Sequence, residues 1–80
     1  MIWGGGIKMP TKYELWYIDM MRKCKSYRKA QKITQSEVAD GMHVYQQDIC
    51  KIENLKTIPN VIKFLEYLDA IGLRIVLKEV

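Results

Sequence analysis

The sequence predicts a mainly α fold of four to five helices, followed by a C-terminal β-strand. Three observations lead to this prediction. Apolar residues recur at helical spacing in two segments, near 17–27 and 61–71. Between them, residues 34–54 carry the start signals of two short helices with a break at 41–44. Beyond residue 72 the apolar residues alternate with others, which is typical of a strand.

The first long helix is expected to begin after Thr11 and to end near Gln31. Thr11 is a suitable N-cap, and Glu14 follows at the spacing of a capping box. The preceding segment, Met1 to Pro10, contains three consecutive glycines and is interpreted as a flexible arm, so that the domain covers 11–80. The residues expected to face inward are Tyr17, Met20, Met21, Cys24 and Tyr27.

Two short helices are expected next, joined by a tight turn. Thr34 and Glu37 form a second capping box. After the break at 41–44, the following helix should start at Tyr45 or Gln46 and end near Asn54. Val38, Ala39, Ile49 and Ile52 are the inward residues of this pair.

The last helix is expected to carry Pro59 in its first turn and to be terminated by Gly72, because these are the favoured positions of proline and glycine. We expect its inward side to consist of Val61, Phe64, Leu65, Leu68 and Ile71.

The tail at 73–79 is predicted to form a strand, in which the dimerisation residues Leu73, Ile75 and Leu77 alternate with Arg74, Val76 and Lys78. A lone strand leaves its backbone N–H and C=O groups without partners. The same strand of a second copy would supply them as an antiparallel ribbon. The sequence therefore predicts a homodimer in which the tail is the dimerisation element.

Composition excludes several classes of protein. No apolar run approaches the roughly 20 residues of a membrane span, and the N-terminus does not resemble a secretory signal. Cys24 and Cys50 fit no metal-binding spacing with the single His43, so we expect reduced thiols, no metal, no cofactor and a cytoplasmic protein. No catalytic arrangement of side chains can be assembled, which argues against an enzyme.

Charge is distributed unevenly along the chain. The residues from Lys8 to Lys32 include eight basic and two acidic side chains, whereas Ile33 to Leu55 contain one basic and four acidic ones. A basic segment of this kind is either a solvated helix face or the contact surface for an anionic partner, most often nucleic acid.

Two motifs make the second interpretation specific. The run I-T-Q-S-E-V-A at 33–39 resembles the L-T-Q-x-E-L-A opening of the phage repressor and Cro family, also called the XRE family. The run I-C-K-I-E-N at 49–54 resembles the I-S-x-I-E-N close of the same family, at matching distance. The resemblance covers most of the chain, from about residue 21 to 77. It implies a repressor-like helix-turn-helix domain whose second short helix enters the major groove of double-stranded DNA.

The resemblance also assigns roles to individual residues. Bases are expected to be read by Gln46, Gln47 and Lys51, with Tyr45 and Cys50 beside them, because Gln pairs with adenine and Lys donates to guanine. Arg28 and Glu53 should form a partly buried ion pair. Backbone phosphates are expected to be contacted by Gln35, Tyr45, Asn54, Lys56, Thr57 and Lys32.

Two positions depart from the family pattern, since His43 and Leu55 stand where glycine is usual. Asp48, on the reading helix, would repel phosphate unless it accepts a hydrogen bond from cytosine.

Three functions remain open from the sequence. The leading one is a transcriptional repressor that reads a roughly palindromic operator as a homodimer. The second is an antitoxin, because a helix-turn-helix followed by I-G-L-R-I-V-L-K-E-V is similar to HipB-type antitoxins, and the apolar side chains around Trp16 suggest a protein partner such as a toxin. The third is a helix-turn-helix domain reused for protein interaction, which the acidic balance of 33–55 favours.

Overall fold

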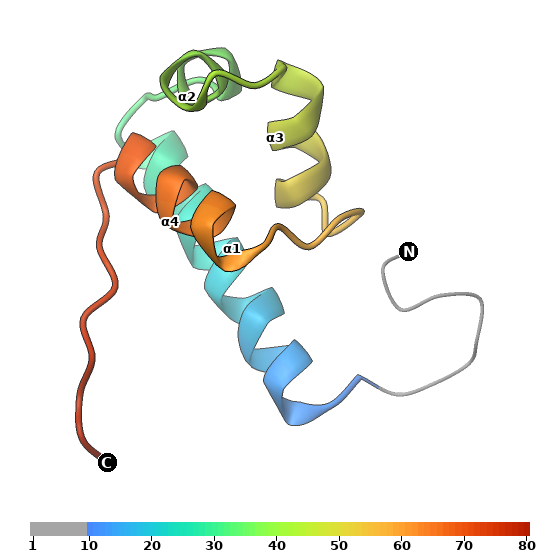
Figure 1. The fold of residues 1–80 in the computed structure, drawn as a ribbon, viewed down its shortest axis with the longest axis vertical. Coiled ribbons are helices and arrows are strands. Elements are labelled where there is room, and N and C mark those ends of the chain that lie inside the picture. The colour runs from blue at the N-terminus through green and yellow to red at the C-terminus, as the bar shows by residue number, and fades with distance from the viewer. Residues whose placement is uncertain (1–9) are drawn as a thin grey trace.

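The computed structural model describes residues 10–80, so the expected N-terminal arm lies outside the described residues except for Pro10. The described part contains four helices: α1 (Lys12–Ala30), α2 (Gln35–Met42), α3 (Gln46–Glu53) and α4 (Val61–Ala70). In Figure 1, the two short helices lie together at one end, while α4 crosses the C-terminal half of α1. The N-terminal half of α1 extends beyond the other helices. The predicted order of two longer helices flanking two short ones is confirmed.

The helix starts match the predicted ones in three of four cases. Both predicted capping boxes are present, at the starts of α1 and α2. At the start of α3, the Asp48 carboxylate accepts a hydrogen bond from the backbone N–H of Tyr45 at 3.1 Å. The prediction for α4 was wrong by two residues: Asn60 is its N-cap and accepts from the Lys63 N–H, so Pro59 precedes the helix. Asparagine is the stronger signal because its side chain satisfies an otherwise free helical N–H.

All four helices end in the same way. The residue after the last helical turn adopts a left-handed backbone conformation, and the next N–H bonds to a carbonyl five residues back, the pattern of a Schellman motif. Glycine takes this position only after α4, where Gly72 has φ 87°. The other three positions are occupied by Lys32 (φ 59°), His43 (φ 57°) and Leu55 (φ 61°). The four closing bonds are Ile33→Arg28, Val44→Ala39, Lys56→Lys51 and Leu73→Leu68.

The core lies where the four helices meet. Val38, Ile49 and Tyr67 are completely inaccessible to solvent. Tyr17 of α1 packs against Phe64 of α4, with ring centroids 6.1 Å apart. The buried apolar residues are Met21, Cys24, Val38, Ala39, Met42, Ile49, Ile52, Phe64, Tyr67, Leu68 and Ile71.

Four of the residues predicted to face inward are instead exposed. On α1, Met20 and Tyr27 border the buried side and retain 37% and 36% of their accessible surface. On α4, Val61 and Leu65 retain 71% and 41%. The buried spacing of α4 is 64, 67, 68 and 71, so Tyr67 takes the inward position that the sequence analysis gave to Leu65.

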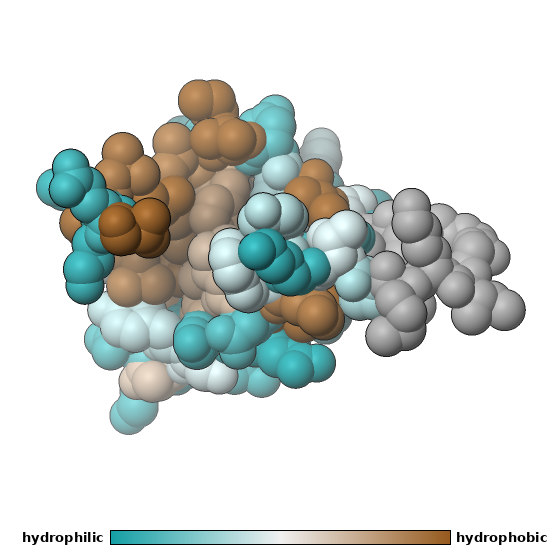
Figure 2. Space-filling model, turned by 90° about the horizontal axis from the view of Figure 1, so that it is seen from below, coloured by the Kyte–Doolittle hydropathy of each residue, from teal (hydrophilic) through white to brown (hydrophobic). Residues whose placement is uncertain are grey.

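The tail beyond α4 forms no β-strand, and no strand occurs anywhere in residues 10–80. The predicted strand at 73–79 is therefore absent from the single chain. Its backbone has no neighbouring strand to pair with, because the rest of the described fold is helical. Leu73 is half-buried against the core, whereas Ile75 and Leu77 are exposed. Figure 2 shows hydrophobic side chains gathered on the left, the side on which Figure 1 places α4 and the tail.

Candidate nucleic-acid interface

The two short helices form a rigid unit that presents the first turn of α3 to solvent. They are joined by the left-handed turn at His43 and pack through Val38, Ala39 and Ile49, all of which are buried. Burial of these apolar side chains fixes the rotation of α3 about its axis. As a result, Gln46 and Gln47 at its first turn are exposed. The turn therefore places two amide side chains at an accessible helix start, where they can reach another molecule.

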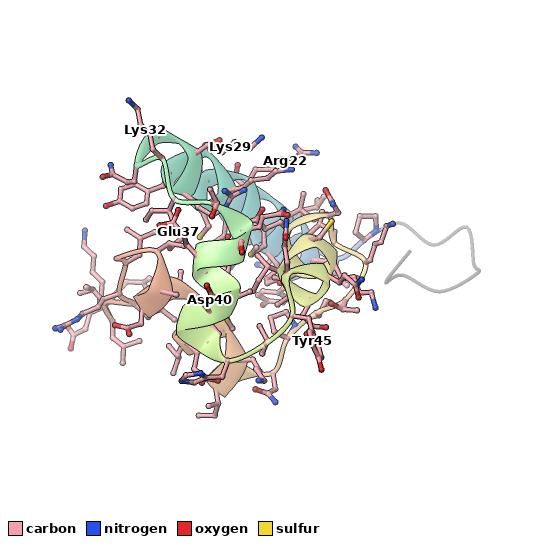
Figure 3. All side chains as sticks on the ribbon, turned by 90° about the horizontal axis from the view of Figure 1, so that it is seen from above. Arg22, Lys29, Lys32, Glu37, Asp40 and Tyr45 are labelled. Atoms are coloured by element: carbon pink, nitrogen blue, oxygen red, sulfur yellow. The ribbon has the colours of Figure 1, made fainter. Side chains whose placement is uncertain are left out.

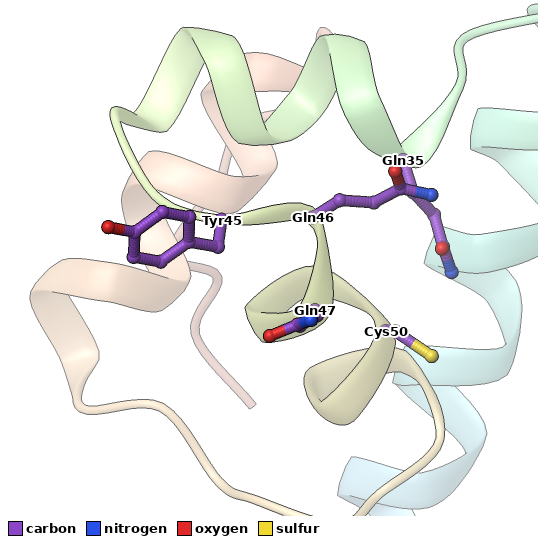
Figure 4. Close-up of a pocket in the computed structure, with 5 residues that line it drawn as sticks. All are labelled: Gln35, Tyr45, Gln46, Gln47 and Cys50. Carbon is purple, nitrogen blue, oxygen red and sulfur yellow. The ribbon is translucent and has the colours of Figure 1, made fainter.

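A surface pocket of about 560 Å³ lies beside this turn. We call it the α2–α3 pocket. Figure 4 shows Gln46 extending toward Gln35 of α2, with Tyr45 on the other side of the turn. Four of the residues assigned to DNA contact thus line one pocket, although they come from two helices. The complete lining consists of Gln35, Tyr45, Gln46, Gln47 and Cys50.

Lys51 and Thr57 line a second pocket, of about 340 Å³, between α3 and the start of α4. Lys63 of α4 also lines it, and this residue was not among the predicted contacts. Asn54, at the end of α3, is exposed, and its side-chain amide lies 3.2 Å from the Cys50 sulfur atom. Lys56 is exposed on the loop that follows. The predicted contact residues of α3 therefore border two pockets: Gln46 and Gln47 line the α2–α3 pocket, and Lys51 lines the second one.

Lys32 is the predicted phosphate contact that the structure separates from the others. Figure 3 shows it with Lys29 and Arg22 along α1, on the opposite side of that view from Tyr45. The acidic side chains of Glu37 and Asp40 lie between these two sides, on α2. Arg22, Lys29 and Lys32 of the basic segment thus lie along α1 and the turn that follows it, and none of them lines the α2–α3 pocket.

The predicted ion pair between Arg28 and Glu53 is present and buried. Arg28 donates from Nε to Glu53 Oε2 at 2.7 Å and from Nη2 to Oε1 at 2.8 Å. Its third donor group, Nη1, bonds to the carbonyl oxygen of Ile33 at 2.6 Å. This parallel two-bond geometry ties α1 to the end of α3 and pairs the two buried charges.

Two further side chains complete the hydrogen bonding of Glu53. The Tyr67 hydroxyl of α4 donates to Oε2 at 2.7 Å, and the Gln35 amide of α2 donates to Oε1 at 3.1 Å. The carboxylate on α3 therefore receives hydrogen bonds from each of the other three helices. We call Arg28, Gln35, Glu53 and Tyr67 the buried network.

The network shifts the titration of its members. Burial by itself raises the pKa of Glu53, but hydrogen bonds from its three donors more than offset this, so its pKa lies below the ordinary value. The hydrogen bond to Glu53 raises the pKa of Arg28. Burial, and then the hydrogen bond to Glu53, raises the pKa of Tyr67. The carboxylate is thus kept charged and the phenol is kept protonated at neutral pH.

Tyr67 is the network residue that the sequence analysis missed. A signal for it was available, because Phe64, Tyr67, Leu68 and Ile71 have the spacing of one helix face. The hydroxyl of a buried tyrosine usually finds a hydrogen-bond partner, and the Glu53 carboxylate was an acceptor already expected in the core. Choosing between 65 and 67 as the inward position required the actual rotation of α4.

The cysteines and the other possible metal ligands of the described residues are not grouped into a site. Cys24 is buried, which raises the pKa of its thiol, and Cys50 is half-buried on α3. Within residues 10–80, no three side chains of the His, Cys, Asp and Glu types are grouped closely enough to hold a metal ion. None of the four helices combines the length and the hydropathy needed to cross a lipid bilayer.

The comparison with protein families agrees with this geometry. Residues 25–77 match the family model described as helix-turn-helix, of the XRE type. Because the match covers more than half of the chain, the protein belongs to this helix-turn-helix family. It is accordingly a DNA-binding regulator of the XRE type. No curated protein and no solved structure matches the chain. The match begins within α1, so the N-terminal half of that helix lies outside the family domain.

Proposed function

We propose that this protein is a sequence-specific transcriptional repressor that reads the major groove as a homodimer. The observation that carries the proposal is the pair of exposed amides, Gln46 and Gln47, held at the first turn of a helix whose opposite face is buried. A glutamine amide can pair with the N6 and N7 groups of adenine. A helix of this size fits the major groove with its first residues at the base edges.

Asp48 does not weaken this proposal, although it adds a negative charge to the reading helix. Its carboxylate accepts the Tyr45 backbone N–H, so it acts as a helix-start residue. Lys51 lies one turn further along, on the same side of α3 as Gln47. Asn54, Lys56 and Thr57 follow at the end of the helix, where exposed donors can contact the sugar–phosphate backbone.

A second copy is the proposed partner of the surface formed by α4 and the tail. This surface includes most of the exposed aliphatic side chains of the described residues: Ile58, Val61, Ile62, Leu65, Ile75 and Leu77. Paired tails would also satisfy the strand backbone that the single chain leaves open. The described chain measures 35 × 34 × 23 Å. A dimer that reads two half-sites must hold its two α3 helices about one DNA turn apart, roughly 34 Å, which is comparable to the longest dimension of one copy.

The test is binding of the purified protein to the DNA upstream of its own coding sequence, across a salt series. Wild type should bind this fragment more tightly than random DNA, with a salt slope steeper than about −4, which corresponds to four or five phosphate contacts. Gln47→Ala should lose the preference. The matched control is Gln31→Ala, which removes an exposed amide at the end of α1, away from the α2–α3 pocket.

Weak binding that is indifferent to sequence and to Gln47→Ala would refute the repressor. It would favour the use of the domain for protein interaction.

An antitoxin role is a second candidate, favoured by the N-terminal half of α1. Tyr13, Leu15 and Trp16 are each more than half exposed, and this part of the helix precedes the family match. Exposed aromatic side chains are the residues that most often anchor a protein partner. If a neighbouring gene encodes a toxin, Trp16→Ala should weaken binding of that toxin and leave DNA binding unchanged. Unchanged toxin binding in Trp16→Ala would argue against this surface.

A further inference from the structure

Tyr67 has no contact with solvent, yet it is two hydrogen bonds away from the surface proposed to meet DNA. Its hydroxyl donates to Oε2 of Glu53, and the other oxygen of the same carboxylate accepts from Gln35 Nε2. Gln35 in turn lines the α2–α3 pocket beside Gln46. We infer that Tyr67 is a positioning residue for DNA recognition: through Glu53 it fixes the side chain of Gln35 in the α2–α3 pocket.

The geometry gives each oxygen of Glu53 two donors. Oε2 accepts from Arg28 Nε and from Tyr67, while Oε1 accepts from Arg28 Nη2 and from Gln35. Arg28 is itself anchored by its bond to the Ile33 carbonyl. Arginine and tyrosine together thus fix the plane of the carboxylate. Removing the tyrosine hydroxyl leaves Oε2 with Arg28 Nε as its donor and weakens the constraint on that plane.

The hydrogen bond to the Glu53 carboxylate uses only part of the hydrogen-bonding capacity of the Gln35 amide. Its amide nitrogen has two N–H groups, and only one of them is needed for Glu53. The second N–H and the amide oxygen are left for a molecule in the pocket. A side chain that is already ordered loses less conformational entropy when it binds. The inference rests on the proposed DNA-reading function for its consequence, but the positioning of Gln35 can be measured without DNA.

The variant is Tyr67→Phe, and the chain supplies a matched control in Tyr17→Phe. Both tyrosines are packed near Phe64, at centroid distances of 6.4 Å and 6.1 Å. In the described part of the chain the Tyr17 hydroxyl is buried without a hydrogen-bond partner, whereas the Tyr67 hydroxyl holds Glu53. Each substitution removes one buried oxygen atom and keeps the ring. They differ in whether that oxygen belongs to the buried network.

The first measurement is solvent exchange and chemical shift of the Gln35 side-chain amide by NMR, in each full-length variant under conditions where it is folded. Tyr67→Phe should shift the Gln35 amide signals and speed their exchange by about fivefold, the equivalent of one ordinary hydrogen bond. Tyr17→Phe should leave them unchanged. Unchanged Gln35 signals in Tyr67→Phe would overturn the inference, whether or not the protein binds DNA.

The second measurement is a double-mutant cycle on a DNA duplex that wild type selects from a random library. Tyr67→Phe should weaken binding about fivefold when Gln35 is present, and by no more than about twofold in Gln35→Ala. Additive effects of the two substitutions would overturn the inference, because Tyr67 would then act independently of Gln35. Failure of wild type to select any duplex would instead refute the proposed function, and the NMR result would still decide the positioning.

Discussion

Arg28 and Glu53 are 25 residues apart in the sequence and are joined by two hydrogen bonds of 2.7 and 2.8 Å in the protein interior. The pair links the end of the reading helix to α1, and Tyr67 and Gln35 extend it to the other two helices. A buried charge pair of this kind is strongly destabilising when one partner is lost, because the other charge remains in a low-dielectric environment. The first two predictions follow from this arrangement.

Glu53→Gln should lower the free energy of unfolding by about 3–5 kcal/mol, because it leaves the buried Arg28 charge without its counter-ion. Urea denaturation monitored by circular dichroism measures the change. Asp19→Asn is the control, since it breaks the exposed pair with Lys23 on the surface of α1 and should cost no more than about 0.5 kcal/mol. If both variants lost a similar free energy of unfolding, the buried Arg28–Glu53 pair would contribute no more to stability than an exposed ion pair.

Acid should destabilise the protein through Glu53. The pKa of this carboxyl group is lowered by folding, so its contribution is complete above its unfolded pKa of about 4.3 and is lost as pH falls from there through the folded value. Urea midpoints for wild type should therefore fall steeply below pH 4.3. In Glu53→Gln this part of the pH dependence should vanish. Parallel pH profiles for the two proteins would contradict the lowered pKa.

The left-handed turns offer a test of backbone strain. His43 is exposed with φ 57°, so His43→Gly should leave stability unchanged or raise it by up to about 1 kcal/mol, as relief of strain exceeds the entropy of glycine in the unfolded chain. Leu55 has the same backbone but packs on the core. Leu55→Gly should lower stability by about 1–2 kcal/mol through lost burial. Thermal unfolding compares the two, and equal effects would mean that packing of Leu55 contributes nothing.

The tail should be required for a dimer. In an antiparallel ribbon Ile75 and Leu77 share one face and Val76 occupies the other. The double substitution Ile75→Lys, Leu77→Lys should therefore yield a monomer at micromolar concentration, as should truncation after Gly72. Val76→Lys should leave the dimer intact. Sedimentation equilibrium measures the mass, and a truncated protein that remains dimeric would rule out the tail as the dimerisation element.

Lys56 should contribute charge rather than sequence preference to DNA binding. Lys56→Met is expected to weaken binding equally to all duplexes and to reduce the salt slope by about one, the loss of one phosphate contact. Lys78→Met makes the same charge change on the exposed tail and should leave the slope unchanged. Fluorescence anisotropy at several salt concentrations gives the slopes. An equal decrease in both variants would show a general effect of net charge.

The sequence by itself determined the order of the helices, the first residues of three of them, and the family. Capping residues act within three positions along the chain, so the boxes at Thr11–Glu14 and Thr34–Glu37 could be recognised without knowing the fold. The buried pair of Arg28 and Glu53 was also predictable, because the motifs around these residues resemble those of the XRE family. The paired roles of Gln46 and Gln47 remain predictions from the same resemblance.

Tertiary structure decided everything that depends on how the helices are rotated against each other. The register of α4 was one such feature: Leu65 and Tyr67 differ by two positions, which on a helix is about 200°, slightly more than half a turn. Only packing of α4 against the other helices, chiefly α2, selects Tyr67 for the interior. The meeting of four helices at Glu53 follows from that choice. The separation of Lys32 from Tyr45 has the same origin, because charge along a sequence does not specify the face on which it lies. The tail at 73–79 shows what a local sequence pattern cannot decide. Alternation of apolar and other residues predicts a strand, but a strand forms only where a second backbone supplies its hydrogen bonds.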